Sequence, residues 1–131
     1  MNNKRLHGLH NNELCDLLIS MGNDDFNDWI VTTAFYSALH FVHHYIFPLN
    51  LQDKTYRSFD VYYLVEQQER DLSKHTVTRN LVGTYISELS VKYNWLFKEC
   101  YNARYRNYIV HKSIAKSAKQ YLDEIRKKTD K

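Results

Sequence analysis

The chain has 131 residues, of which 44% are hydrophobic and 25% charged, values typical of a single globular domain with a buried core. Three glycines and one proline supply little turn chemistry for hairpins, which argues against a mainly β fold. The net charge of +3 is unevenly distributed: residues 98–131 hold ten Lys/Arg against four Asp/Glu, whereas residues 1–97 hold eight against eleven. The basic C-terminal quarter therefore forms either a surface for phosphates or a solvated helix face.

The beginning of the chain predicts a frayed segment followed by a short helix. Residues 1–11 are polar and are expected to be flexible. A helix is predicted to begin near Asn12, because leucines recur from there at helical spacing, and to end at Gly22. The leucines are Leu14, Leu17 and Leu18.

A longer helix is predicted over residues 25–47, where Pro48 stops it. Acidic residues at its start favour a helix N-terminus there. Two apolar lines cover most of its circumference, so we expect this helix to lie at the centre of the fold. Small residues in its middle would let a neighbouring helix approach closely. They are Ala34, Ser37 and Ala38.

The second half of the chain predicts a loop and three more helices. Residues 48–57 read as the loop and residues 59–69 as a short helix, although part of the latter is β-prone. Apolar spacing over 73–101 predicts one long helix with Gly83 as its weak point, and 114–128 predicts an amphipathic last helix. The whole chain is therefore expected to form one all-α bundle of four to five helices.

The cysteines and the hydropathy pattern suggest where the protein resides. Cys15 and Cys100 lie far apart without Cys-x-x-Cys spacing, so we expect free thiols and a cytoplasmic location. No segment approaches the roughly 18 consecutive apolar residues of a membrane span, and no signal-like run follows the N-terminus. No membrane partner is expected.

Residues 100–111 hold the side chains best suited to chemistry: two arginines, two asparagines, three tyrosines and a histidine. Arg106 is a permanent cation, and His111 takes and gives a proton near neutral pH. Cleavage of RNA needs a base for the 2′-hydroxyl, an acid for the leaving oxygen and a cation for the charge on the phosphate. This pair therefore suits phosphodiester cleavage in RNA, and no cofactor is expected.

The spacing of this pair sets a geometric condition. On an unbroken helix, five residues of separation leave Arg106 and His111 roughly 140° apart. They converge only if the helix ends between them or if a second copy of the chain supplies partners. Arg104, seven residues before His111, is a rival for the role of the arginine.

Three further kinds of residue near this pair are candidates for binding. Asn107 either orients His111, binds phosphate or simply ends a helix. Tyr108 belongs to a tyrosine stripe that either stacks on bases or packs in the core or a dimer contact. Lys112 and Lys116 are candidates for steering RNA by charge.

Two histidine groups outside this stretch have alternatives of their own. His40 and His44 stand one helical turn apart with His43 between them, which is metal-ligand spacing. No carboxylate or cysteine completes the set, so we interpret them as structural and expect no metal. His75 and Arg79 are also one turn apart and either add to a phosphate site or are solvated at a helix start.

The stretch Arg106-Asn107-x-x-x-His111 resembles the motif of the HEPN domains (higher eukaryotes and prokaryotes nucleotide-binding), whose nuclease members carry Arg, four to six residues, then His, often with Asn after the Arg. Residues 29–40 look like the central helix of that family. The triplet 103–105 and the helix 115–125 look like its C-terminal end. The resemblance covers most of the chain from about residue 24.

The resemblance implies a small helical bundle that forms a homodimer and cleaves RNA without a metal, with His111 as base and acid and Arg106 on the phosphate. It implies a toxin or defence component, with an antitoxin or a nucleotidyltransferase as partner. Other HEPN-like domains are non-catalytic. The alternative is therefore a dimeric module that binds nucleic acid, a nucleotide or a partner protein.

Overall fold

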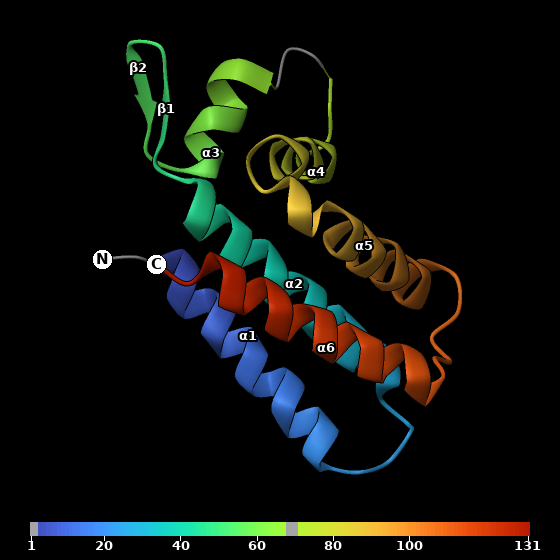
Figure 1. The fold of residues 1–131 in the computed structure, drawn as a ribbon. Helices are drawn as coiled ribbons and strands as arrows, with labels where there is room; N and C mark the ends of the chain where they lie inside the picture. The colour runs from blue at the N-terminus through green and yellow to red at the C-terminus, as the bar shows by residue number, and fades with distance from the viewer. Residues whose placement is uncertain (1–2, 68–70) are drawn as a thin grey trace.

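Four long helices form an all-α bundle in the computed structural model, which describes residues 3–67 and 71–131 (Figure 1). They are α1 (Asn3–Ser20), α2 (Asn27–Ile46), α5 (Ser90–Tyr105) and α6 (Lys112–Thr129). Helix α2 lies at the centre, and α1, α5 and α6 pack along it. The predicted all-α bundle is confirmed. No helix among the described residues combines the length and the apolar character needed to cross a bilayer.

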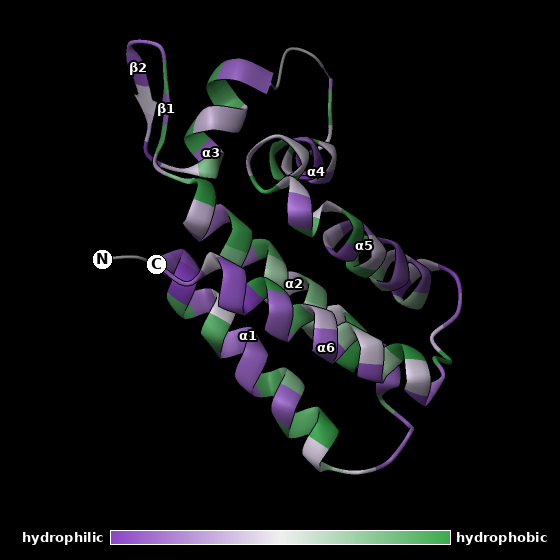
Figure 2. Ribbon diagram, viewed as in Figure 1, coloured by the Kyte–Doolittle hydropathy of each residue, from purple (hydrophilic) through white to green (hydrophobic). Residues whose placement is uncertain are grey.

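Helix α2 is central because it has no continuous polar face. Ile30, Val31, Thr32 and Thr33 are four consecutive buried residues, each about 100° further round the helix, so α2 is covered on every side there. Figure 2 shows little purple along α2, whereas purple bands recur along α1 and α6. The helix ends just before the cis Phe47–Pro48 bond, where the sequence places its end.

The small residues of α2 bring α1 very close. Ser37 Oγ donates a hydrogen bond of 2.7 Å to the Gly8 carbonyl oxygen across the two helices. A Cβ atom on Gly8 would lie 2.7 Å from Cε1 of Phe41, so this position has no space for any side chain. The predicted close approach is confirmed.

Helix α1 itself departs from the prediction. It begins at Asn3 instead of near Asn12, and its buried face consists of Gly8, Asn12 and Cys15. Leu14 and Leu17, the expected core residues, are 43% and 59% exposed. The polar start is helical because its small and polar residues pack on α2. Residues 1–2 of the predicted flexible segment lie outside the described residues.

Asn12 shows how α1 uses polar contacts. Its Oδ1 atom accepts a hydrogen bond of 2.9 Å from Nζ of Lys119 on α6. The same ammonium lies 2.7 Å from Asp16 and 2.9 Å from Asp123, so three oxygens share its charge. This network attaches α1 to α6 through polar contacts.

A small cap lies at one end of the bundle (Figure 1). Strands β1 (Leu49–Leu51) and β2 (Lys54–Tyr56) form an antiparallel hairpin in the predicted loop, with Gln52 at a positive φ of 55° in the turn. Helix α3 (Phe59–Tyr62) continues as the π-helical segment η1 (Tyr63–Gln67). The remainder of the predicted helix, 68–69, lies outside the described residues.

The predicted long helix over 73–101 is two helices. Helix α4 (Lys74–Tyr85) is followed by the short 3-10 helix η3 (Ser87–Leu89) and then by α5. The break falls at Ile86, which is 2% exposed, and not at Gly83. Burial of Ile86 and of Leu89 in the core turns the chain there, and apolar spacing along the sequence does not reveal such a turn.

The close contact between α1 and α2 gives a stability prediction. Gly8→Ala is expected to lower the free energy of unfolding by about 2 kcal/mol, because the added methyl group clashes with Phe41. Gly83→Ala is the control, since it places the same methyl group on an exposed helix position with nothing closer than 4.0 Å. It should raise stability by up to about 1 kcal/mol. Urea unfolding measures both, and equal effects would contradict the close contact.

Candidate nucleic-acid interface

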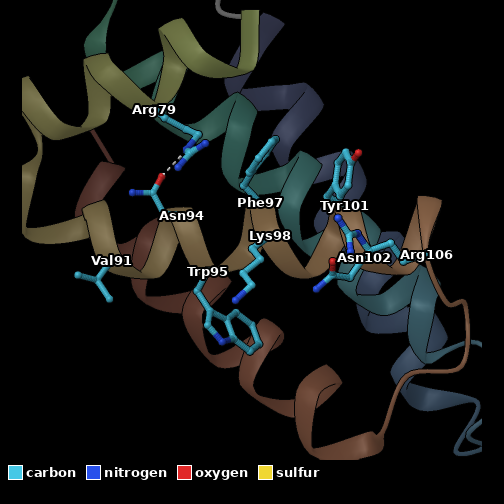
Figure 3. A pocket seen from close by; sticks show the side chains of 9 residues that line it. All are labelled: Arg79, Val91, Asn94, Trp95, Phe97, Lys98, Tyr101, Asn102 and Arg106. Atoms are coloured by element: carbon cyan, nitrogen blue, oxygen red, sulfur yellow. Dashed lines mark hydrogen bonds between the residues drawn. The ribbon is translucent and has the colours of Figure 1, made fainter. Parts of the chain in front are cut away.

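A groove of about 660 Å³ runs along α5 and contains three cationic side chains (Figure 3). Arg79 comes from α4, Lys98 from the middle of α5, and Arg106 from its C-terminal end. Three aromatic rings share the lining: Trp95, Phe97 and Tyr101. None of the described residues that line the groove is a carboxylate. A basic, aromatic and uncompensated groove suits the phosphates and bases of a single-stranded nucleic acid.

Two of the cations lie against aromatic rings. The guanidinium carbon of Arg79 is 5.0 Å from the ring centre of Phe97, and Nε of Arg79 donates a hydrogen bond of 2.9 Å to Asn94 Oδ1. The guanidinium carbon of Arg106 is 5.9 Å from the ring centre of Tyr101. Figure 3 shows these rings projecting from α5 with Arg79 approaching from α4. Such stacking orients each guanidinium while leaving most of its N–H groups for a ligand.

Helix α5 ends between Arg106 and His111, which is the first of the two conditions set by their spacing. The backbone N–H groups of Arg106 and Asn107 both donate to the Asn102 carbonyl oxygen, at 2.9 and 2.8 Å. Asn107 Oδ1 then accepts a hydrogen bond of 3.0 Å from the Ile109 N–H. Asn107 therefore closes the turn after α5 with its side chain.

His111 begins the next helix. Its Nδ1 atom accepts a hydrogen bond of 3.0 Å from the backbone N–H of Ser113 and lies 2.8 Å from Ser113 Oγ, which makes His111 the N-cap of α6. A neutral imidazole that accepts at Nδ1 carries its proton on Nε2. His111 is exposed, so it presents an N–H donor beyond its role in the cap.

The structure does not join Arg106 to His111 directly. Among the described residues, the recorded contact of the Arg106 guanidinium is with Tyr101, whereas His111 binds Ser113. The two side chains share an exposed connection of six residues, 106–111, and this connection is fixed at Val110, whose carbonyl oxygen accepts a bond of 3.0 Å from Nδ2 of Asn27.

The other predicted residues are dispersed. Arg104 stacks on Trp29, with 4.3 Å between the guanidinium carbon and the ring centre, and it lines a different cavity from Arg106. Lys112 and Lys116 line a third cavity beside the α1–α2 loop. Tyr108 is 68% exposed at the tip of the connection. Only Arg106 of the predicted set lies in the groove.

Sequence reasoning missed most of the groove. Asn94, Lys98 and Asn102 recur every four residues, so one helix face carries them, but nothing in that spacing marks the face as functional. Arg79 was weighed only together with His75. Its place opposite Lys98 and Arg106 depends on the turn at Ile86, which the apolar pattern does not reveal.

The three histidines of α2 have separate partners, and Nε2 of His44 lies 3.4 Å from the Lys131 carbonyl oxygen. His43 stacks on Phe59 at 4.2 Å and its Nε2 lies 2.9 Å from Thr78 Oγ1, whereas His40 stacks on His7 at 3.8 Å. Burial lowers the pKa of His43 to about 3 and that of His40 to about 4, so both are neutral at pH 7. Among the described residues, no group of three His, Cys, Asp or Glu side chains is placed to hold a metal.

Comparisons of the chain with protein-family models, with curated proteins and with solved structures found no match. The resemblance to HEPN domains therefore stays a prediction that rests on the residues quoted for it.

The buried His43 gives a prediction of pH dependence. In the unfolded chain His43 has the ordinary histidine pKa of 6.5, whereas in the folded chain it takes up a proton only near pH 3. The free energy of unfolding therefore decreases as the pH falls below 6.5. Between pH 6.5 and 5 this residue alone should lower the free energy of unfolding by about 2 kcal/mol. Urea unfolding of His43→Gln, in which an amide replaces the ring, should show a flatter profile over that range. Parallel profiles for the two proteins would contradict a neutral, buried His43.

Proposed function

We propose that the chain binds single-stranded RNA along the α5 groove and cleaves it without a metal ion. One observation carries this proposal: Arg106 belongs both to the groove and to the exposed connection that ends in His111. An RNA strand whose phosphates contact Arg79, Lys98 and Arg106 reaches the connection 106–111. Among the described residues, this is the only segment that contains both a cation of the groove and an exposed histidine.

In this proposal, the 2′-hydroxyl oxygen attacks the adjacent phosphorus and the bond to the 5′-oxygen breaks, which leaves a 2′,3′-cyclic phosphate. Arg106 stabilises the negative charge that builds on the phosphate oxygens. As an imidazolium, with Nδ1 protonated and released from the Ser113 N–H, His111 gives its Nε2 proton to the departing 5′-oxygen and becomes neutral, and the proton of the 2′-hydroxyl passes to water. A homodimer, as the HEPN resemblance implies, would set two such pairs beside one strand.

A second candidate function is RNA binding without cleavage. It is favoured by the cap that His111 forms, because Nδ1 is held by the Ser113 N–H and the ring cannot exchange its tautomer without releasing the first turn of α6. A histidine held in one tautomer donates to phosphate but serves poorly as a base. The partner of such a module would be RNA, together with a second copy of the chain or an antitoxin-like protein.

Cleavage assays in EDTA test the catalytic proposal. His111→Asn should lower the cleavage rate by roughly 100-fold or more, because asparagine retains the N-cap but transfers no proton. Arg106→Gln should have a comparable effect through the loss of the cation. The control is His10→Asn, which removes an exposed histidine from α1. RNA that is bound but left intact by the wild type would favour the binding module, and cleavage that survives in both variants would eliminate the proposed roles.

Salt dependence tests the groove independently of catalysis. Three phosphate contacts predict that log Kd rises with log salt concentration with a slope of about 2, and Arg106→Gln should lower that slope by about 0.7. Arg57→Gln, which removes an exposed charge next to the hairpin, should leave the slope unchanged. Fluorescence anisotropy of a labelled RNA at several salt concentrations measures both, and equal slopes for all three proteins would contradict binding in the groove.

A further inference from the structure

A second cavity, of about 450 Å³, lies on the other side of two aromatic rings that also line the groove. These rings, Phe97 and Tyr101, have their centres 6.5 Å apart and form a ridge that belongs to both spaces. Across the cavity, α2 contributes Tyr36 and α4 contributes His75. We call this space the aromatic cavity, since most of its lining is aromatic.

Several polar groups that line the aromatic cavity have no recorded hydrogen-bond or ion-pair partner among the described residues. They include the hydroxyl of Tyr36, the ring nitrogens of His75 and the guanidinium of Arg104, whose recorded contact is the stacking on Trp29. The ring of His75 packs against other rings, with its centre 5.3 Å from that of Phe97 and 5.7 Å from that of Phe35. Groups of this kind inside a preformed cavity are available to bind a ligand.

The ionisation states define the ligand further. Burial lowers the pKa of His75 and raises that of Tyr36, so both are neutral near pH 7 and offer hydrogen bonds without charge. Burial also raises the pKa of Cys100, another lining residue, to about 11, which keeps it a thiol and excludes a thiolate nucleophile. Arg104 is then the one charged residue of the described lining, at its rim.

We propose that the aromatic cavity holds one unstacked base of the RNA strand whose phosphates lie in the α5 groove, with guanine preferred. The proposal rests on the function proposed above and adds base selection to it. The ridge of Phe97 and Tyr101 between the α5 groove and the aromatic cavity is one ring thick. A strand that lies in the groove can therefore rotate one base over the ridge into the cavity. Aromatic walls stack on any base.

The preference for guanine follows from Arg104. Its planar fork of N–H donors matches the adjacent acceptors O6 and N7 of guanine, a pair of acceptors that no other RNA base presents on that edge. The Tyr36 hydroxyl and a ring nitrogen of His75 supply further neutral hydrogen bonds to the base. A phosphate alone would not explain the aromatic walls, and the described lining has no carboxylate for a metal ion.

Binding of matched hexanucleotides tests the proposal. One RNA is a uridine hexamer with a single central guanosine, and the other carries an abasic site at that position. The wild type should bind the guanosine RNA about tenfold more tightly than the abasic RNA. In His75→Phe, which retains a ring but loses both nitrogens, and in Arg104→Gln, this ratio should fall towards one. In Lys98→Gln, a groove variant, both affinities should fall by the same factor and the ratio should persist.

The outcomes separate the two proposals. Equal affinities of the wild type for the two RNAs would overturn the aromatic cavity while leaving RNA binding in the groove intact. If the wild type binds neither RNA, the proposed function is wrong, and titration with guanosine 5′-monophosphate then tests the aromatic cavity by itself. Binding of the nucleotide that His75→Phe abolishes would support a base site, and no binding would overturn it. Near-ultraviolet circular dichroism of each variant verifies that the aromatic packing is retained.

Discussion

The fold depends on the burial of α2, a helix that has apolar side chains on nearly every side. Each side must be covered, because each buried large apolar side chain contributes roughly 1.5–3 kcal/mol relative to exposure. Helices α1, α5 and α6 cover three sides of it, and α4 covers the end near the hairpin (Figure 1). The position of every other helix, and therefore of the groove, follows from this requirement.

Helix α5 shows how that requirement shapes the site. Its buried stripe, which includes Tyr93 and Leu96, faces α2 and α6. The remaining circumference has to lie outside the core, and it is there that Lys98, Tyr101 and Arg106 line the groove. One helix thus supplies a wall to the core, to the groove and to the aromatic cavity. Substitutions on the ridge of Phe97 and Tyr101 are therefore expected to affect both spaces at once, which is why the experiments above use residues that line only one of them.

The sequence predicts the fold better than the site, for physical reasons. The helical spacing of apolar residues predicted α2 and α6 and their approximate ends, because a helix face that is buried along its length needs apolar residues at regular intervals in the sequence. The start of α1 was missed because Gly8 and Asn12 pack through contact and hydrogen bonding, which leave no apolar trace. The break at Ile86 was missed because an apolar residue inside a turn looks the same as one inside a helix. Within the site, Arg106 was found from its chemistry, while Arg79 and Lys98 depend on how α4 turns back on α5.

The two ends of the described chain are held together at the end of α6 opposite His111. Arg5 at the start of α1 lies 3.3 Å from Asp130 at the end of α6, and α6 spans 18 residues, roughly 27 Å, from there back to His111. A short peptide could therefore join the ends, and new ends could be opened in the hairpin turn at Gln52, without altering α5. Such a circular permutant would keep the groove and the aromatic cavity intact. For the same reason, a protein attached at either end, or a surface that immobilises the chain there, would stand a helix length away from His111.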